Sequence, residues 1–214
     1  MKPYNDLTRL GRLRRMRQLA RTALDSYGLA EASCSLVVQA GNTLYRIHDQ
    51  ARRFPSPAGN LYAQDQYLLR IYAHGWQAAE ASQLELDWLV AMRREADLPV
   101  QEPIPNLSGA LLMRVAIPGL PEPRQCSLLR WVKGRELGHT ARARDYHALG
   151  QLMARMHNFA EHWQHPAGRF KRRYDWNGLF RNDAEIRALN KEHIDLMQER
   201  LRELSPGVEP VKVH

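Results

Sequence analysis

Residues 67–92 read YLLRIYAHGWQAAEASQLELDWLVAM and contain the clearest structural signal in the chain. The first seven residues alternate between two sets of side chains, which predicts a strand with Arg70 central on one face. From residue 77 to 96 the apolar residues recur at helical spacing, and Glu85 falls on their stripe. Because an unpaired buried charge is costly, we predict that Glu85 pairs with Arg70. The stripe comprises Ala81, Glu85, Trp88 and Met92.

Further strands are predicted on both sides of this stretch. Residues 35–48 read SLVVQAGNTLYRIH, in which two β-prone runs flank Gly41-Asn42. A dipeptide with glycine first suits a two-residue turn, so we predict a hairpin. Downstream, ALLMRVAIPG (110–119) and QCSLLRWVKG (125–134) are short apolar runs bounded by Pro and Gly, and each predicts a strand. The sequence therefore predicts five strands with one helix inserted among them.

The chain changes from β-rich to α-rich near residue 136. Beyond Gly138, apolar residues recur at helical spacing from Tyr146 to Ala160, and residues 182–204 predict a further helix. We expect three parts: a basic helix over 1–28, a β-rich lobe over 29–136 and a partial helical lobe over 137–214.

The N-terminal segment carries most of the net charge of +8. Apolar residues, mostly leucines, recur every three or four residues from Leu7 to Ala23, which predicts an amphipathic helix that ends near Tyr27-Gly28. No aromatic residue lies between the arginines, so we interpret them as a solvated face in preference to a phosphate-binding arm. A mitochondrial transit peptide remains an alternative on composition alone. The basic residues of this segment are Lys2, Arg9, Arg12, Arg14, Arg15, Arg17 and Arg21.

Several other classes of protein are disfavoured. Cys34 and Cys126 are isolated and give no disulfide or zinc-site spacing, which fits a reducing cytosol. No run approaches the roughly 18 apolar residues of a membrane span, and the N-terminus lacks a secretory signal. The histidines do not share one helical face, and no HExxH pattern occurs. We expect a cytoplasmic protein with no metal site in this sequence.

The order of the predicted elements resembles the small lobe and linker of a protein-kinase-like fold. More specifically, it resembles the aminoglycoside phosphotransferase and choline kinase superfamily, which includes bacterial small-molecule kinases. The resemblance implies an α+β fold, with a kinase-like N-terminal lobe of about five antiparallel strands and one inserted helix, followed by part of a helical C-terminal lobe. The stretches that resemble this superfamily are AGNTLYRI (40–47), YLLRIY (67–72), ELDWLVAM (85–92), LLRWVKGREL (128–137) and LGQLMARMH (149–157).

The resemblance gives Arg70 and Glu85 a role. In kinases a basic strand residue contacts the nucleotide phosphates and is held by a Glu of the neighbouring helix. A surface arginine and an unrelated helical Glu remain the structural alternative. The superfamily commonly has a lysine where this sequence has Arg70. A planar guanidinium then replaces a compact ammonium group, so the sequence leaves the geometry of a phosphate contact undecided.

Two more nucleotide contacts are implied by the resemblance. The turn Gly41-Asn42-Thr43 would lie over the phosphates, although an ordinary hairpin turn explains its glycine equally well. The strand-to-linker segment would offer backbone groups of Arg130, Trp131 and Val132 to the adenine. Trp131 fits a packing role equally well.

The last residues, VKVH (211–214), resemble the strand that leads into the catalytic loop. In this fold class an Asp of that loop orients the attacking hydroxyl, and later Asn and Asp residues bind Mg²⁺. The sequence stops before these residues, so it assigns no catalytic residue and no metal ligand. We expect a truncated form that is inactive alone, with Mg²⁺ needed only in a full-length form.

The resemblance leaves two functions open. The first is the ATP-binding portion of a small-molecule kinase that transfers the γ-phosphate of ATP to a hydroxyl of a metabolite or antibiotic. The second is an inactive half-kinase that acts as a nucleotide- or partner-binding module. We expect ATP and a small hydroxyl-bearing substrate as partners, and neither a membrane nor nucleic acid. An oligomer through exposed lobe surface stays open.

Overall fold

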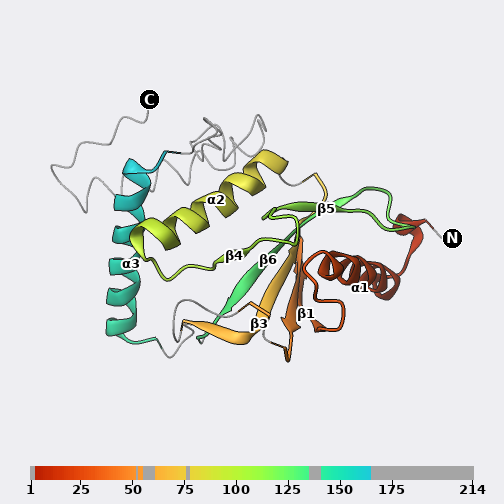
Figure 1. Cartoon of the computed structure of the whole chain (residues 1–214), viewed down its shortest axis with the longest axis horizontal. Helices are drawn as coiled ribbons and strands as arrows, with labels where there is room; N and C mark the ends of the chain where they lie inside the picture. Colours follow the sequence, from red (N-terminus) through yellow and green to blue (C-terminus); the bar gives the residue numbers. More distant parts are fainter. Residues whose placement is uncertain (1–2, 52, 55–60, 76–77, 135–140, 165–214) are drawn as a thin grey trace, which may run out of the picture. The chain divides into compact units, whose positions relative to one another are not determined.

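The computed structural model describes residues 3–51, 53–54, 61–75, 78–134 and 141–164. A short 3₁₀ turn (Tyr4–Asp6) precedes helix α1 (Arg9–Asp25). The strands follow, with helix α2 inserted after the third of them, and helix α3 comes last (Figure 1). These elements are β1 (Ser33–Ala40), β2 (Asn42–His48), β3 (Tyr62–Ile71), α2 (Ala79–Ala96), β4 (Pro103–Ile104), β5 (Met113–Val115), β6 (Arg124–Val132) and α3 (Ala143–His162).

One antiparallel sheet organises this part of the chain. The strand order is β1-β2-β3-β6-β4, and β5 also pairs with β6. The predicted α+β class with a kinase-like N-terminal lobe is confirmed, with one correction: the described sheet has six strands, not five. The sequence missed β4, a two-residue strand that begins with Pro103. Proline has no backbone N–H to donate to a neighbouring strand, so within sheets it is found mainly on edge strands. β4 is at the end of the strand order, which is consistent with this rule.

The predicted hairpin forms, but its turn is tighter than expected. Ala40 pairs with Asn42, so Gly41 alone connects β1 to β2. Gly41 has a φ of 72°, in the left-handed region where a Cβ is unfavourable. Asn42 is therefore the first residue of β2 and not a turn residue.

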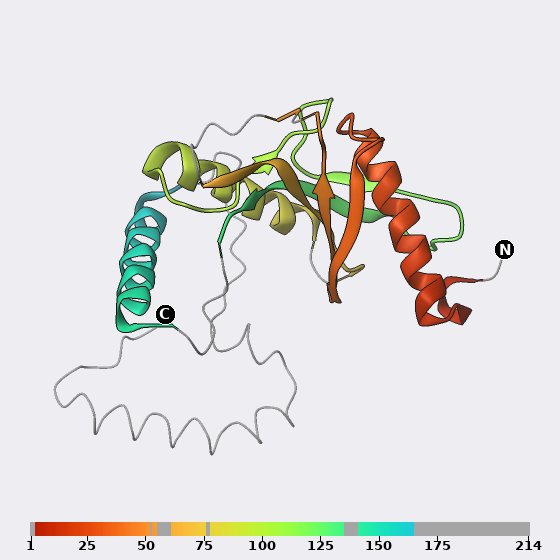
Figure 2. The same ribbon diagram turned by 90° about the horizontal axis from the view of Figure 1, so that it is seen from below.

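Strand β3 forms where the alternation of side chains predicted a strand, and it contributes buried residues to both sides of the sheet. Leu69 and Ile71 belong to the main core, which packs against α1. Leu68 belongs to a smaller cluster with Leu86 of α2 and Leu129 of β6. We call these two sides of the sheet the α1 face and the α2 face; Figures 1 and 2 show the strands between the two helices. The strand begins at Tyr62, earlier than predicted, because a register shift against β6 accommodates its polar N-terminal half.

Helix α1 forms where the leucine pattern predicted, but only its second half is buried. Thr8 caps it, since its Oγ1 accepts a hydrogen bond from Gly11 N at 3.2 Å. The predicted core residues Leu7 and Leu13 are only half-buried, and Leu10 is 58% exposed. The buried residues of α1 are Met16, Leu19, Ala20, Ala23 and Leu24.

The buried stripe of α2 differs from the predicted one. Ser82, Leu86 and Met92 are buried, whereas Ala81 and Trp88 are half-buried. The helix is thus rotated so that Leu86 faces the sheet and Glu85 lies at the margin of the contact. At the margin a carboxylate reaches the strand and still keeps part of its hydration, which lowers the cost of burial.

Helix α3 lies where the sequence predicted a helix beyond Gly138, and it has no buried residue. Nη2 of Arg155 donates to the carbonyl of Ala96 at 3.0 Å, at the end of α2. A cation there complements the carbonyl end of a helix. No helix among the described residues is long and apolar enough to cross a bilayer. The predicted helix at 182–204 and the predicted strand at 211–214 lie outside the described residues.

Candidate functional site

The predicted ion pair is present on the α2 face. Nη1 of Arg70 in β3 donates to Oε1 of Glu85 in α2 at 2.5 Å. The side chain of Arg70 is 16% exposed and that of Glu85 is 37% exposed. The pair therefore joins strand to helix at a position that remains open to solvent on the side of the carboxylate.

Two residues that the sequence did not single out surround Arg70. Tyr72 is the first residue after β3, and the centre of its ring lies 5.6 Å from the guanidinium carbon of Arg70. The Tyr72 hydroxyl is 3.3 Å from Oγ of Ser127, a buried residue of β6 that pairs with Arg70. Tyr72 lies two residues after Arg70, and this same-face spacing in a strand was a signal that could have identified it.

The electrostatics of this group keep Arg70 charged. Burial lowers the pKa of Arg70, but Tyr72 and the carboxylate of Glu85 raise it, and the net effect is a raised pKa. Burial also raises the pKa of Tyr72. Arg70 is thus a fixed cation held between a ring and a carboxylate, which is the type of group that can bind an anionic ligand.

The predicted phosphate turn is close in space to the end of β3. Leu44 pairs with Arg70 across the β2–β3 ladder, so Leu44 is on the α2 face and Thr43, 4% exposed, is on the α1 face. Oδ1 of Asn42 accepts a hydrogen bond from Ala73 N at 3.0 Å. The side chains of Thr43 and Asn42 are therefore engaged in the fold, and this turn offers a ligand mainly the backbone around Gly41.

The predicted base-binding segment is the end of β6. Arg130 N donates to the carbonyl of Glu102 at 2.9 Å, and Lys133 N donates to that of Leu61 at 2.9 Å. Successive strand residues direct their peptide groups to alternate edges, so Arg130 and Val132 face one edge and Trp131 faces β3. Arg130 N is thus occupied, and the backbone of Trp131 points away from the edge that the other two share.

The side chains of this segment have structural partners. Nε of Arg130 lies 2.9 Å from Oε2 of Glu102, and its Nη1 donates to the carbonyl of Phe54 at 2.8 Å. Trp131 packs against the small cluster of the α2 face, and the guanidinium of Arg46 lies 4.7 Å from its ring centre. Arg130 therefore ties the segment to the preceding loops, and Trp131 has the packing role that the sequence left open.

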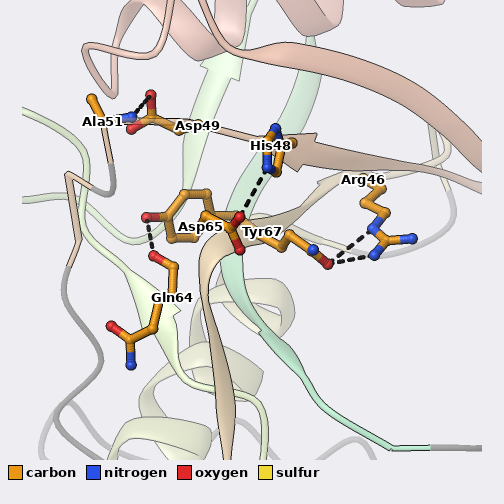
Figure 3. A network of polar contacts seen from close by, with 8 residues as sticks. Arg46, His48, Asp49, Ala51, Gln64, Asp65 and Tyr67 are labelled. Carbon is orange, nitrogen blue, oxygen red and sulfur yellow. Dashed lines mark hydrogen bonds and ion pairs between the residues drawn. The ribbon is translucent and has the colours of Figure 1, made fainter.

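A polar network connects β2 and β3 (Figure 3), and its Arg46 is the residue that lies over the Trp131 ring. Nη2 of Arg46 donates to Oε1 of Gln66 at 2.5 Å, and Nε2 of His48 lies 2.9 Å from Oδ2 of Asp65. Sequence analysis did not identify this network, because its partners lie 17 and 20 residues apart and no periodic pattern links them. It fixes the register of the two strands beside the candidate site.

Two hollows on the described surface lie along α3 and not at Arg70. One, of about 410 Å³, includes Glu95, Arg155 and His162; the other, of about 880 Å³, includes Pro99 and Leu152. Neither is lined by a residue of the predicted site. Among the residues that the structure describes, no group of three His, Cys, Asp or Glu side chains is placed to hold a metal ion.

The sheet, its inserted helix and the Arg70–Glu85 pair together define a kinase-like N-terminal lobe. The resemblance to the aminoglycoside phosphotransferase and choline kinase superfamily is confirmed by the solved structures that share this fold, which are small-molecule kinases. One is a microcompartment-associated aminopropanol kinase, with a TM-score of 0.63 and 25% identity over 89% of this chain and 59% of that chain. Another is the amicoumacin kinase hAmiN in complex with AMP-PNP, Ca²⁺ and Ami, with a TM-score of 0.56 and 16% identity over 88% of this chain and 54% of that chain.

The sequence thus spans somewhat more than half the length of these kinases. No family model matches it, and no curated protein matches it. The likeness is therefore one of fold, and the chemistry of this chain has to be argued from its own residues.

Proposed function

We propose that this chain is the nucleotide-binding portion of an ATP-dependent small-molecule kinase, which transfers the γ-phosphate of ATP to a hydroxyl. The observation that carries the proposal is the Arg70–Glu85 pair, with Nη1 and Oε1 2.5 Å apart. In this role Arg70 contacts the phosphates and Glu85 holds it in place. Both solved neighbours are named as kinases, and one is in complex with the ATP analogue AMP-PNP.

The α2 face also suits a planar base. Val38 pairs with Leu44 and is 41% exposed, and Leu44 packs against the buried Leu68. These side chains offer an apolar surface of the kind on which an adenine ring can be buried. At the edge of that surface the carbonyl of Arg130 and the N–H of Val132 would pair with the base, since both face the same edge of β6.

The backbone at Gly41 would cover the phosphates. A Cβ placed on Gly41 has no neighbouring atom within 4 Å, so the turn is open and a phosphate can approach its backbone. The residues described here do not supply Mg²⁺ ligands, and we propose none from them. A nucleotide without its metal-binding half-site is expected to bind weakly, because the metal ions neutralise much of the phosphate charge.

The test measures whether phosphates or only the base is bound. A ligand that binds the folded state raises the melting temperature, so the protein is melted with millimolar ATP plus Mg²⁺ and, separately, with adenosine. We expect a larger shift with ATP. Arg70→Met should reduce the ATP shift to that of adenosine, whereas Arg94→Met, an exposed arginine of the same helix as Glu85, should not.

Two results would contradict the proposal: equal shifts for ATP and adenosine in the wild type, or an Arg70→Met variant that keeps the ATP preference. The alternative function, an inactive nucleotide- or partner-binding module, predicts the same shifts. The two functions are distinguished by the coding sequence downstream of codon 214. Reading through into an Asp with a later Asn and Asp would support the kinase, whereas a stop codon there would favour the module.

A further inference from the structure

The N-terminal half of α1 presents a basic surface that the candidate nucleotide site does not use. No residue from 6 to 15 is buried, and the buried residues of α1 begin at Met16. Figure 2 shows the first turns of the helix projecting past the strands. The arginines of the helix are Arg9, Arg12, Arg14, Arg15, Arg17 and Arg21.

These arginines have no carboxylate partner within the described part of the chain. The ion pairs there involve other cations, such as Arg70, Arg93 and Arg130. Arg21 donates to the carbonyl of Ala32 at 2.7 Å, and Arg15 lies 3.4 Å from the side chain of Gln18. The positive charge of α1 is therefore not neutralised locally.

The placement of this charge opposes the helix dipole. The first turn of α1 has no acidic residue and contains Arg9 and Arg12. Cations near a helix N-terminus are unfavourable by about 0.3–1 kcal/mol each at low salt. An anionic partner would relieve both this penalty and the mutual repulsion of the guanidinium groups.

One stripe of this surface combines charge with an exposed apolar side chain. At helical spacing Leu10, Arg14 and Arg17 share a face, because they lie four and then three residues apart. Leu10 is 58% exposed, and Arg14 and Arg17 are exposed. The surface can therefore make one apolar contact beside two side chains that bind carboxylates strongly.

We propose that this stripe, Leu10 with Arg14 and Arg17, docks an acidic amphipathic segment of a partner protein. Arginine binds carboxylates through two parallel hydrogen bonds, and a leucine gains only from an apolar partner side chain. A bilayer fits less well, because binding there needs a broad apolar side along the helix, and the apolar side chains of α1 from Met16 onward lie in the core. Single-stranded nucleic acid fits less well, because α1 has no aromatic side chain for stacking. Duplex DNA fits less well, because the exposed Leu10 gains nothing from a phosphate backbone.

The experiment compares matched probes on the full chain by fluorescence anisotropy. The first probe is a labelled amphipathic peptide of glutamate and leucine, and the second is the same peptide with its leucines replaced by glutamine. We expect the first to bind more tightly. Leu10→Gln should weaken the first probe and leave the second unchanged, and Arg14→Glu with Arg17→Glu should weaken both by about tenfold or more.

The matched control carries the same charge change elsewhere. Arg94→Glu with Arg144→Glu, at exposed positions of α2 and α3, should keep most of the affinity for the first probe. Equal losses in the two double variants would overturn the proposal in favour of a net-charge effect. Tighter binding of duplex DNA, or of phosphatidylserine vesicles, than of the first peptide would overturn it in favour of those partners. Circular dichroism confirms that each variant is folded.

Discussion

Nε of Arg130 lies 2.9 Å from Oε2 of Glu102, and the two side chains are 11% and 24% exposed. The same guanidinium donates through Nη1 to the carbonyl of Phe54 at 2.8 Å. One side chain at the end of β6 thus joins the segment before β4 to the segment before β3. These connections set the position of the backbone that we propose as the base-binding edge.

Replacing Arg130 should therefore be costly. Arg130→Met keeps the length of the side chain but leaves the Glu102 carboxylate and the Phe54 carbonyl without this donor. We expect a loss of about 2–3 kcal/mol in the free energy of unfolding, less than for a fully buried pair because Glu102 retains some hydration. Urea denaturation measures this loss. Arg130→Met together with Glu102→Leu should recover part of it, and a double variant no more stable than the single one would contradict the assignment.

The pair between Arg70 and Glu85 gives a second prediction, on coupling. In a double-mutant cycle of Arg70→Met and Glu85→Gln, we expect a coupling energy of about 1 kcal/mol, since the carboxylate is partly exposed. Chemical denaturation of the four proteins gives the value. Glu95→Gln, at an exposed position near the end of α2, is the control and should be nearly neutral. A coupling energy near zero would mean that the contact does not hold the helix to the strand.

The sequence predicted this pair because both residues follow simple periods. Alternation along the strand puts Arg70 on the other face of the sheet from Leu69. Helical spacing then puts Glu85 on the side of its helix that lies near the sheet. The rotation of α2 could not be predicted, because both flanks of its stripe are apolar and packing chooses between them. Similarly, β4 has too few residues to show a period, and its existence depends on pairing with the already formed β6.

The partners of Arg130 were beyond sequence analysis for a different reason. Glu102 and Phe54 are distant in sequence, in segments without periodicity, and only the folded sheet brings them together. The sequence identified the segment as a site through its resemblance to kinases, which concerns backbone positions. The side-chain contacts of such a segment depend on its neighbours in space.

Asn42 offers a third prediction, which separates a structural role from a ligand role. Its Oδ1 accepts a hydrogen bond from Ala73 N at 3.0 Å. Asn42→Ala should lower the free energy of unfolding by about 1 kcal/mol, because the backbone donor loses its partner. Asn42→Asp keeps an acceptor and should cost less. If the role is structural, nucleotide-induced shifts remain as in the wild type once the lower melting temperature is taken into account. A selective loss of the ATP shift in Asn42→Ala would instead indicate a direct phosphate contact.

The pH dependence of stability gives a fourth prediction, which concerns Tyr45 of β2. Tyr45 is 2% exposed in the main core, and burial raises the pKa of its hydroxyl to about 12. In the unfolded chain this pKa is about 10. The folded state therefore binds a proton that the unfolded state releases, so the contribution of Tyr45 to stability is complete below about pH 10 and is lost as pH rises toward 12.

At about pH 11 this linkage amounts to about 1 kcal/mol for Tyr45 alone. Urea denaturation near pH 8 and near pH 11 measures the alkaline loss, to which other buried tyrosines also contribute. We expect Tyr45→Phe to show an alkaline loss smaller than that of the wild type by about 1 kcal/mol, because phenylalanine has no proton to release. Tyr146→Phe, at a position 61% exposed, should keep the wild-type profile. If the alkaline losses of the wild type and Tyr45→Phe were equal, Tyr45 would have to ionise as readily in the core as in the unfolded chain, which would contradict its burial.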